Sequence, residues 1–318
     1  MYDYAWRLWD YWERHLDPAL FVDRSLKGTV GGKVVLVTGG SSGIGLAAAC
    51  RFAEAGAITL ICGRGEDKLA AAVQEITAHA GPAAQVFSYS VDIADEASCA
   101  EFVKTLKAQH GGVDFLINNA GRSIRRAIEA SYDRFHDFER TMQLNYFGSL
   151  RVTMGLLPGM VAKQKGHVVN LSSISVLVNA PRFSAYVASK AALDAWTRCA
   201  ASEFSDQGIT FTTVNMPLVR TPMTAPTKIY DSMPLLKPEE AADMIVQACI
   251  DKPSRVATRL GIVGALLHTA APRVTQIIMN TTFRMFPDSA AAKGDKAGKK
   301  TLSPEAIAMA QMMRGIHF

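Results

Sequence analysis

A glycine-rich turn, TGGSSGIG at residues 38–45, joins the apolar run KVVLVT to the amphipathic segment LAAACRFAEAG. The apolar run predicts a buried strand, and the segment after the turn predicts a helix. Gly39 permits a tight turn, Gly43 a close approach of the backbone to a pyrophosphate, and Gly45 close packing of helix on strand. A merely flexible turn is the alternative, but a strand, a glycine-rich turn and a helix in this order favour a dinucleotide-binding unit.

Short apolar runs alternate with amphipathic segments along the core of the chain. This alternation predicts right-handed βαβ units, so the expected fold class is α/β, a Rossmann-like doubly wound parallel sheet in a single domain. Past Pro226 we expect the chain to leave the core sheet, and we expect Pro238 to open a helix that runs to about residue 250. Strands are expected at residues 34–38, 58–62, 85–91, 115–118, 167–171 and 209–215.

Tyr186 and Lys190 lie four residues apart in FSAYVASKAALDAW, and Ser173 precedes the tyrosine by thirteen positions. On a helix this spacing places the phenol and the ammonium on one face, one turn apart. A nearby cation stabilises phenolate, so we expect Lys190 to lower the pKa of Tyr186 and make it a usable general acid. Taken alone, such a pair is more typical of a solvated helix face, so its interpretation depends on the other motifs.

Further motifs lie between the turn and this pair: NNAG at residues 118–121 and LN at residues 144–145. With the turn, Ser173 and YxxxK, they resemble the short-chain dehydrogenase/reductase family over about residues 31–225. That resemblance implies a nicotinamide-dependent oxidoreductase with a catalytic tetrad. Its members are Tyr186 as proton donor, Ser173 polarising the carbonyl, Lys190 binding the nicotinamide ribose, and Asn145 holding a water in the proton relay.

The motifs sit within the longer runs INNAGRSIRRAIEASYDRFHDFERTMQLNYFG, APRFSAYVASKAALDAWTRC and MPLVRTPMTAPTKIY. These runs resemble the bacterial fatty acyl-CoA reductases of this fold, as does Met216-Pro217, where most short-chain reductases have Pro-Gly. The resemblance implies NADPH-dependent reduction of long-chain fatty acyl-CoA to fatty aldehyde. The opening YWERHLDPALFVDRSLKGTVGGKVVLVTGG resembles the joining segment of two-reductase enzymes, which implies fusion to, or docking with, an upstream reductase domain.

The tetrad by itself does not choose the carbonyl substrate. For a thioester we expect direct hydride reduction to a hemithioacetal, whose collapse releases coenzyme A thiol and an aldehyde. No covalent acyl-enzyme is expected, because none of the cysteines lies in the matched motifs. The alternatives are a reductase of ketones, 3-oxoacyl groups or aldehydes on the same scaffold, and a catalytically idle dinucleotide-binding module.

The end of the second strand, at Gly63 and Arg64, predicts the cofactor. NAD-binding enzymes commonly place a carboxylate there for the ribose hydroxyls, whereas this chain has none and Arg64 offers a charged fork, so NADPH is predicted. The alternative is that Arg64 starts a solvated helix. Asp92 is expected to bind the adenine amine or, alternatively, to cap a helix near Glu96. The expected cofactor-binding residues are Gly39, Ser41, Ser42, Gly43, Ile44, Gly45, Arg64, Asp92, Ile93, Asn119, Ala120, Gly121, Tyr186, Lys190, Val219 and Thr221.

A basic cluster, Arg122, Arg125 and Arg126, follows the fourth expected strand. Open α/β sheets bind ligands beyond the carboxyl ends of their strands, so these arginines could receive coenzyme A phosphates. The alternative is salt bridging to the stretch SYDRFHDFER or to a second subunit. His136 in that stretch is expected to be a packing or surface residue rather than a base.

The formal net charge of +5 is modest and dispersed, which argues against a nucleic-acid partner and suits a polyanionic ligand. The cysteines, Cys50, Cys62, Cys99, Cys199 and Cys249, are scattered without metal-ligand spacing. They predict reduced core residues and no metal site. The aromatic, charged N-terminus does not resemble a secretory signal, so a cytoplasmic protein is expected.

The expected organisation is an aromatic helix and linker at residues 1–30, a reductase domain at 31–286 with its substrate side at about 217–286, and a flexible linker and helix at 287–318. The aromatic helix is expected to dock on its own or a neighbouring domain, or to lie on a membrane. The apolar stretch at 257–286 is expected to line an acyl channel or touch lipid, or alternatively to pack beneath the cofactor domain. The family resemblance implies a homodimer or homotetramer.

Overall fold

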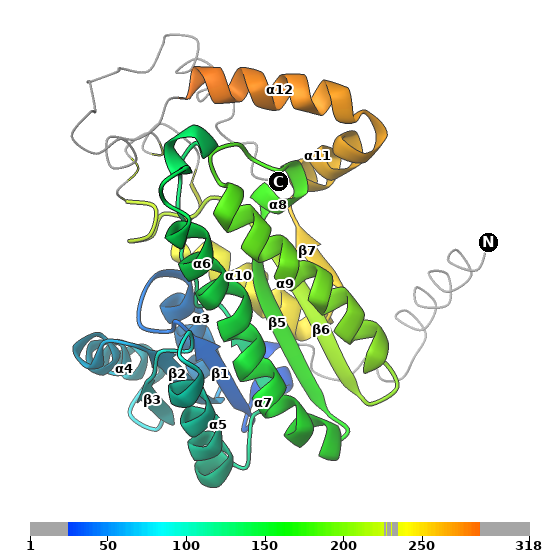
Figure 1. Cartoon of the computed structure of the whole chain (residues 1–318). Coiled ribbons are helices and arrows are strands. Elements are labelled where there is room, and N and C mark those ends of the chain that lie inside the picture. The colour runs from blue at the N-terminus through cyan, green and yellow to red at the C-terminus, as the bar shows by residue number, and fades with distance from the viewer. Residues whose placement is uncertain (1–24, 226, 228–229, 231–234, 287–318) are drawn as a thin grey trace.

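The computed structural model describes residues 25–225, 227, 230 and 235–286. They form a single domain around one parallel sheet of seven strands in the order β3-β2-β1-β4-β5-β6-β7 (Figure 1). The order reverses between β1 and β4, which is the switch point where open α/β sheets bind ligands. The strands are β1 Val34–Thr38, β2 Ile58–Gly63, β3 Val86–Ser90, β4 Phe115–Asn118, β5 Gly166–Ser173, β6 Ile209–Met216 and β7 Arg255–Ala257.

Helices cover both faces of the sheet, because alternate side chains of each central strand point to opposite faces. In β1, Val35 and Val37 enter the core beneath α3 and α10, whereas Val34 and Leu36 enter the core beneath α5 and α7. The helices are α2 Leu26–Val30, α3 Gly43–Glu54, α4 Glu66–Ala80, α5 Glu96–His110, α6 His136–Met142, α7 Ser149–Ala162, α8 Ile174–Val178, α9 Ser184–Glu203, α10 Pro238–Asp251, α11 Arg259–Ala270 and α12 Pro272–Met285.

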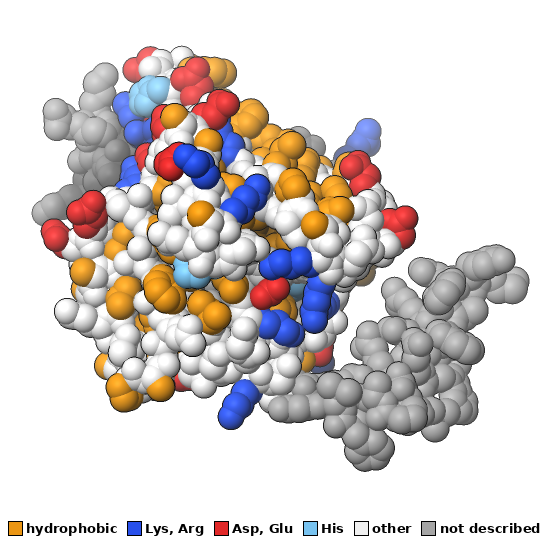
Figure 2. Space-filling view, turned by 90° about the horizontal axis from the view of Figure 1, so that it is seen from below, with side chains coloured by type: hydrophobic (Ala, Val, Ile, Leu, Met, Phe, Trp, Pro, Cys, Tyr) orange, Lys and Arg blue, Asp and Glu red, His pale blue; other side chains and the backbone are white. Residues whose placement is uncertain are grey.

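Two short elements complete the described chain: a 3-10 turn, η2 Ile128–Ser131, and a π-helical turn, η3 Gln143–Gly148. Helices α11 and α12 form a hairpin that crosses the molecule at the end where α8 and the start of α9 lie (Figure 1). On the opposite side, Figure 2 shows acidic and basic side chains interspersed with apolar ones. The hairpin lies beyond the carboxyl end of β5, where α11 packs against α8.

The doubly wound parallel sheet confirms the predicted fold class, and the six expected strands occur with boundary shifts of one or two residues. Our expectation that the chain leaves the sheet after residue 226 is wrong, because β7 pairs in parallel with β6. This strand has three residues, and none of them is fully buried. A half-exposed edge strand of that length leaves no apolar run by which sequence could reveal it. The helix expected from Pro238 is α10, which ends at Asp251.

Four of the cysteines are buried, but Cys199 is exposed, which corrects the expectation that all belong to the core. The reason is its place on α9, where it lies outside the helix face that packs on the sheet. Among the described residues, the helices are too short or too polar to traverse a bilayer. The predictions for the aromatic helix before residue 25 and for residues 287–318 lie outside the described residues.

Candidate active site

Tyr186 and Lys190 lie one turn apart on α9, at the carboxyl-end side of β5. Lys190 is 4% exposed, and its ammonium donates a hydrogen bond of 2.6 Å to the backbone oxygen of Leu171. Burial lowers the pKa of Lys190 to about 8, because the charged form loses hydration that one carbonyl does not replace. The pair therefore does not lie on a solvated helix face, because Lys190 is buried and Tyr186 is partly buried.

The expected lowering of the Tyr186 pKa is wrong. Burial raises the pKa of this phenol, and a hydrogen bond with Ser173 opposes the rise without cancelling it. The amine of Lys190 is directed to Leu171 instead, so it does not act as the counter-ion that the spacing alone suggested. A raised pKa keeps the phenol protonated at neutral pH, which is the form that a proton donor requires.

Ser173 ends β5 and caps α8. Its Oγ accepts hydrogen bonds from the backbone N–H of Ser175 at 3.2 Å and from the Ser175 hydroxyl at 2.8 Å. Through its own hydroxyl it also pairs with Tyr186. The strand end and the following cap thus hold this hydroxyl beside the phenol.

Asn145 is fully buried in the π-helical turn between α6 and α7, a kind of turn that is frequent at functional sites. Its Nδ2 donates to Ser189 Oγ and to Arg122 O, both at 2.9 Å, and its Oδ1 accepts from Arg122 N at 2.8 Å. A Cβ atom on Gly121 would lie 3.2 Å from this Oδ1 and 3.5 Å from Lys190 Nζ. The structure therefore brings the asparagine and the lysine together around Gly121.

The glycine-rich turn adopts the geometry that its sequence predicts. Gly39 has a φ of +66° and Gly43 a φ of +56°, which L side chains rarely adopt. A Cβ atom on Gly45 would lie 2.4 Å from Gly39 O and 2.5 Å from Asn119 Nδ2. The turn and the first turn of α3 are thus packed backbone against backbone, which leaves the helix N–H groups pointing out of the sheet.

Thr38 connects this turn to the NNAG motif. Its Oγ1 accepts hydrogen bonds from the backbone N–H of Asn119 and of Ala120, each at 3.0 Å. The side chain of Asn119 donates back to Thr38 O at 2.9 Å and to Gly39 O at 3.1 Å. Asn119 and Ala120 therefore bind the turn itself, and they support the cradle in which a pyrophosphate would lie.

Other predicted cofactor residues lie around the same cradle. A Cβ atom on Gly43 would lie 3.2 Å from the Thr221 methyl carbon, and one on Gly63 would lie 3.3 Å from Ser41 Oγ. Thr221 follows the β6 strand end, next to buried Val219. Ser42 caps α3, Ile44 lies in its first turn, and Ile93 is buried beside Gly148. A side chain at Gly43 or Gly63 would therefore press on Thr221 or Ser41.

A cavity of about 360 Å³ lies at the ends of β2 and β3. Its walls include Arg64 and Asp92, as the cofactor prediction requires, and also Arg122 and Arg140. Burial lowers the pKa of Arg122, and the charges of Arg140 and Arg64 lower it further, while Asp92 and Asp137 oppose them. Three guanidinium groups around one cavity suit a phosphate better than a ribose hydroxyl. Sequence reasoning missed Arg140, which lies in an otherwise acidic and aromatic stretch.

The alternative role of Asp92 as a helix cap is wrong. The cap of α5 is Asp95, which accepts from Ser98 N at 2.7 Å, whereas Asp92 accepts from Ala94 N at 3.0 Å. Arg64 does not start α4 either, since Gly65 caps that helix and Glu66 begins it. The side chains of Asp92 and Arg64 both line the cavity instead.

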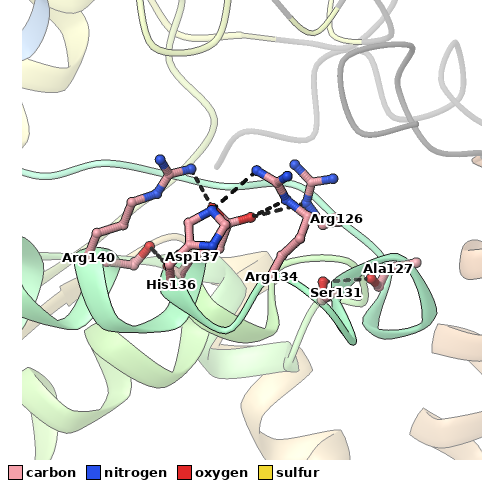
Figure 3. A network of polar contacts seen from close by, with 8 residues as sticks. Arg126, Ala127, Ser131, Arg134, His136, Asp137 and Arg140 are labelled. Carbon is pink, nitrogen blue, oxygen red and sulfur yellow. Dashed lines mark hydrogen bonds and ion pairs between the residues drawn. The ribbon is translucent and has the colours of Figure 1, made fainter. Parts of the chain in front are cut away.

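The expected basic cluster is not one cluster. Arg122 lines the cavity, Arg125 donates to Phe286 O at 3.2 Å, and Arg126 lies 3.2 Å from Asp137 Oδ2 in an ion pair. Arg134 and Arg140 converge on the same carboxylate (Figure 3). Arg126 therefore forms the salt bridge of the alternative, and its partner Asp137 lies in the stretch SYDRFHDFER.

Asp137 is almost fully buried. Burial by itself would raise the pKa of this carboxyl, but the hydrogen bond from Arg134 and the charges of Arg140, Arg134 and Arg126 lower it. His136 lies beside it with a half-exposed side chain, consistent with a surface role. The network anchors the segment between β4 and α7, which carries both Arg122 and Asn145. Among the described residues, no three His, Cys, Asp or Glu side chains are grouped for a metal ion.

Comparison with known proteins identifies the family. Residues 33–230 match the family model of the short chain dehydrogenases. The chain is 51% identical over 267 residues to a fatty acyl-CoA reductase of Acinetobacter baylyi, which covers 84% of this chain and 90% of that protein. It is 42% identical over 267 residues to a fatty acyl-CoA reductase of Mycobacterium tuberculosis, with 83% and 90% covered.

Among solved structures, an actinorhodin polyketide ketoreductase with NADPH superimposes with a TM-score of 0.66 at 25% identity, covering 73% of this chain and 97% of that one. The sheet order, the glycine-rich turn at the switch point and the YxxxK pair on α9 agree with these similarities. The chain is an oxidoreductase that belongs to the short-chain dehydrogenase family.

Proposed function

We propose that this protein reduces long-chain fatty acyl-CoA to fatty aldehyde with NADPH. The observation that carries the proposal is the 51% identity to a fatty acyl-CoA reductase over nine-tenths of that relative's length. At such identity the substrate-side elements, and not only the cofactor motifs, are shared. Buried Lys190 and the partly buried hydroxyls of Ser173 and Tyr186 supply the groups that carbonyl reduction needs.

The residues of the chain would act on the thioester as follows. The hydroxyls of Ser173 and Tyr186 bind the carbonyl oxygen, and NADPH, when bound, supplies a hydride for the carbonyl carbon. Tyr186 donates its proton to the oxygen as negative charge develops there, which gives a hemithioacetal. When the carbon–sulfur bond breaks, the electron pair leaves with sulfur and the hydroxyl proton passes to it, so that coenzyme A thiol and aldehyde are released. The phenolate regains its proton from Lys190, which takes up a proton from solvent.

Lys190 and Asn145 would support that proton transfer. With a pKa of about 8, Lys190 can return a proton to the tyrosine near neutral pH. Asn145 is held by three hydrogen bonds to Arg122 and Ser189, so its orientation does not change during turnover. No cysteine enters the scheme. Burial raises the pKa of Cys50, Cys62, Cys99 and Cys249 to about 11 or 12, which keeps those thiols protonated. Cys199 is exposed on α9 and lies outside the matched motifs.

NADPH rather than NADH is proposed because Arg64 and Arg122 face one cavity with Asp92 at the adenosine end of the cradle. A 2′-phosphate would gain charge-assisted hydrogen bonds from these guanidinium groups. The carboxylate that would repel it is absent after β2, where Gly63 and Arg64 stand. The related ketoreductase structure, which contains NADPH, is consistent with this choice.

The deciding experiment follows NADPH oxidation with hexadecanoyl-CoA, together with thiol release and identification of the lipid product. We expect thiol to form in step with NADPH loss. Tyr186→Phe should lower kcat at least a hundredfold while NADPH still binds, and the control Tyr132→Phe, at an 80% exposed position, should retain full activity. Turnover of ketones or aldehydes without thiol release would make the protein a carbonyl reductase, and NADPH binding without any turnover would make it an idle module.

We propose a homodimer or homotetramer that pairs through the helices bearing Asn145 and Tyr186. Phe147 and Met154 near the first of these helices are 41% and 60% exposed, which gives such an interface apolar side chains to bury. Light scattering during size-exclusion chromatography, with Met154→Glu as the variant, tests it. Docking with an upstream reductase domain is proposed from the N-terminal resemblance. Size-exclusion chromatography of the protein mixed with such a domain would test it.

We also propose a cytoplasmic location with contact to a membrane surface through the α11–α12 hairpin. Its outer face exposes Val263, Leu266 and Ile277 by 60% to 68%, and the charged side chains of both helices are arginines. Such a face suits the interface of an anionic bilayer. Sedimentation with vesicles of anionic and of neutral lipid tests this, and equal recovery in the supernatant with both vesicles would contradict it.

A further inference from the structure

A second cavity, of about 450 Å³, lies on the substrate side of the molecule, apart from the arginine-lined one. Its walls come from η2, the loop between α8 and α9, the start of α9, and α12. The apolar wall is formed by Ala127, Ile128, Ala180, Pro181, Val187 and Phe283. A volume of this size is within the range of about 300–1,000 Å³ for small-molecule sites.

The cavity borders both catalytic segments. Ser173 begins the α8 segment whose following loop supplies Pro181, and Val187 follows Tyr186 directly on α9. The Phe183 ring contacts the Tyr186 ring edge-on, with centroids 6.4 Å apart. Ser173 and Tyr186 are not among the lining residues, but the segments that carry them form walls of the cavity, which therefore lies next to the position where these hydroxyls would bind a carbonyl.

The outer wall is specific to this chain's C-terminal region. The family model ends at residue 230, whereas Phe283 lies on α12. Arg182 holds that phenylalanine, since its guanidinium carbon lies 3.9 Å from the ring centroid. The Arg182 backbone has a φ of +69° and its carbonyl accepts from Arg126 N at 2.7 Å. Such an unusual backbone at a non-glycine residue is typical of ligand clamps.

The lining is mostly apolar, which favours a hydrocarbon over an anionic group. Glu129 and Arg182 are its charged residues, the former would repel a phosphate, and the latter is stacked on Phe283. We propose that this cavity binds the alkyl chain of the acyl substrate, and that Phe283 and Val187 set the chain length accepted. This inference rests on the proposed function, whose substrate class it makes specific.

The test measures both binding and turnover along a series of saturated acyl-CoAs from eight to eighteen carbons. Each methylene that enters the cavity should tighten binding by about fourfold. Titration calorimetry with Tyr186→Phe as the background gives dissociation constants without turnover. In this background, we expect Val187→Phe to weaken hexadecanoyl-CoA at least tenfold and octanoyl-CoA less than twofold. Phe283→Ala should move the preferred chain toward longer substrates by two carbons or more.

Gln276→Ala is the matched control, because this residue is on the same helix but its side chain is polar and exposed. Phe283→Leu is a milder variant whose preference should move in the same direction if Phe283→Ala does not fold. An unchanged chain-length profile in folded Val187 and Phe283 variants would overturn the inference. Chain-length-dependent binding without thiol release by the wild type would instead refute the proposed reductase and leave the alkyl site standing.

Discussion

The two halves of this domain bury polar groups very differently. In the described residues before Asn118, only Thr38 and Thr59 are buried polar side chains. From Asn118 onward they are frequent and include charged groups, namely Asp137, Lys190 and Asp194. We call residues 25–117 the nucleotide half and the described residues from 118 onward the substrate half. The first is held by apolar packing and backbone contacts, and the second also by buried hydrogen bonds.

The partners in the substrate half are far apart in sequence. Asn118 donates to Asn170 at 2.7 Å, Asn145 donates to Ser189 at 2.9 Å, and Arg255 donates to Asp194 at 3.1 Å. A buried polar group without its partner costs more than the bond itself contributes. The stability of the substrate half therefore depends on hydrogen bonds and ion pairs between particular side chains. The stability of the nucleotide half depends more on the absence of side chains where two backbone segments meet.

The largest effect should come from removing the charge at Asp137 in the substrate half. Asp137→Asn leaves Arg126, which is 14% exposed, without its carboxylate, so we expect a loss of about 3–5 kcal/mol in the free energy of unfolding. Urea denaturation measures it. The control is Asp243→Asn, which breaks the ion pair with Arg51 at 44% and 59% exposure and should cost less than about 1 kcal/mol. Equal losses would remove the contrast between buried and exposed pairs.

The second-largest effect should come from the close approach of the α3 backbone to the glycine-rich turn in the nucleotide half. Gly45→Ala places a methyl group 2.4 Å from Gly39 O, and we expect about 1–3 kcal/mol of destabilisation together with weaker NADPH binding. The same change at Gly159 in α7 meets no atom within 4 Å and should stabilise the protein by about 0.5–1 kcal/mol. Thermal unfolding and cofactor titration of both variants check this, and opposite signs are the expected result.

Acid should weaken the substrate half through His167, whose ring contacts Thr210 Oγ1 at 2.8 Å and Ala248 O at 3.1 Å. Burial, and then the charge of Lys252, lowers the pKa of His167 to about 3, below its ordinary 6.5. Between these values the unfolded chain binds the extra proton, so the stability is complete above about pH 6.5 and is lost as the pH falls toward 3.

We expect this histidine to account for about 2 kcal/mol of the stability lost between pH 7 and pH 5. Urea titrations at both pH values, for wild type and His167→Gln, measure the difference. The variant should be less stable at pH 7 but lose less on acidification. An identical pH dependence in both proteins would show that the histidine is protonated without cost.

The smallest effect is the one on cofactor choice at the exposed edge of the nucleotide half. Arg64→Ala should weaken NADPH binding about tenfold and leave NADH binding within twofold, because one charge-assisted hydrogen bond is lost from a cavity that keeps Arg122. Fluorescence titration with both cofactors checks this. An equal loss of affinity for both cofactors would place Arg64 outside the 2′-phosphate site. The variant Arg122→Ala would then test whether Arg122 binds that phosphate.

The nucleotide half could be predicted closely because its constraints are local. A strand, three glycines and a helix follow one another within residues 34–54, and their geometry needs no distant partner. The tetrad stays a prediction from the family motifs, and the direction of the Tyr186 pKa shift could not be predicted from the sequence. The burial that raises it, and the carbonyl of Leu171 that occupies Lys190, come from segments that the spacing does not describe.

The sequence alone predicts the α/β class, the parallel sheet and the positions of its six central strands along the chain, because periodicity and glycine placement act over a few residues. Tertiary structure alone decided that Arg122, Arg125 and Arg126 separate to three different partners. It also decided that β7 returns to the sheet and that Phe283 meets the catalytic side. Apart from the ion pair of Arg126 with nearby Asp137, these depend on contacts between residues more than forty positions apart. The free energy of such contacts exists only once the chain is packed.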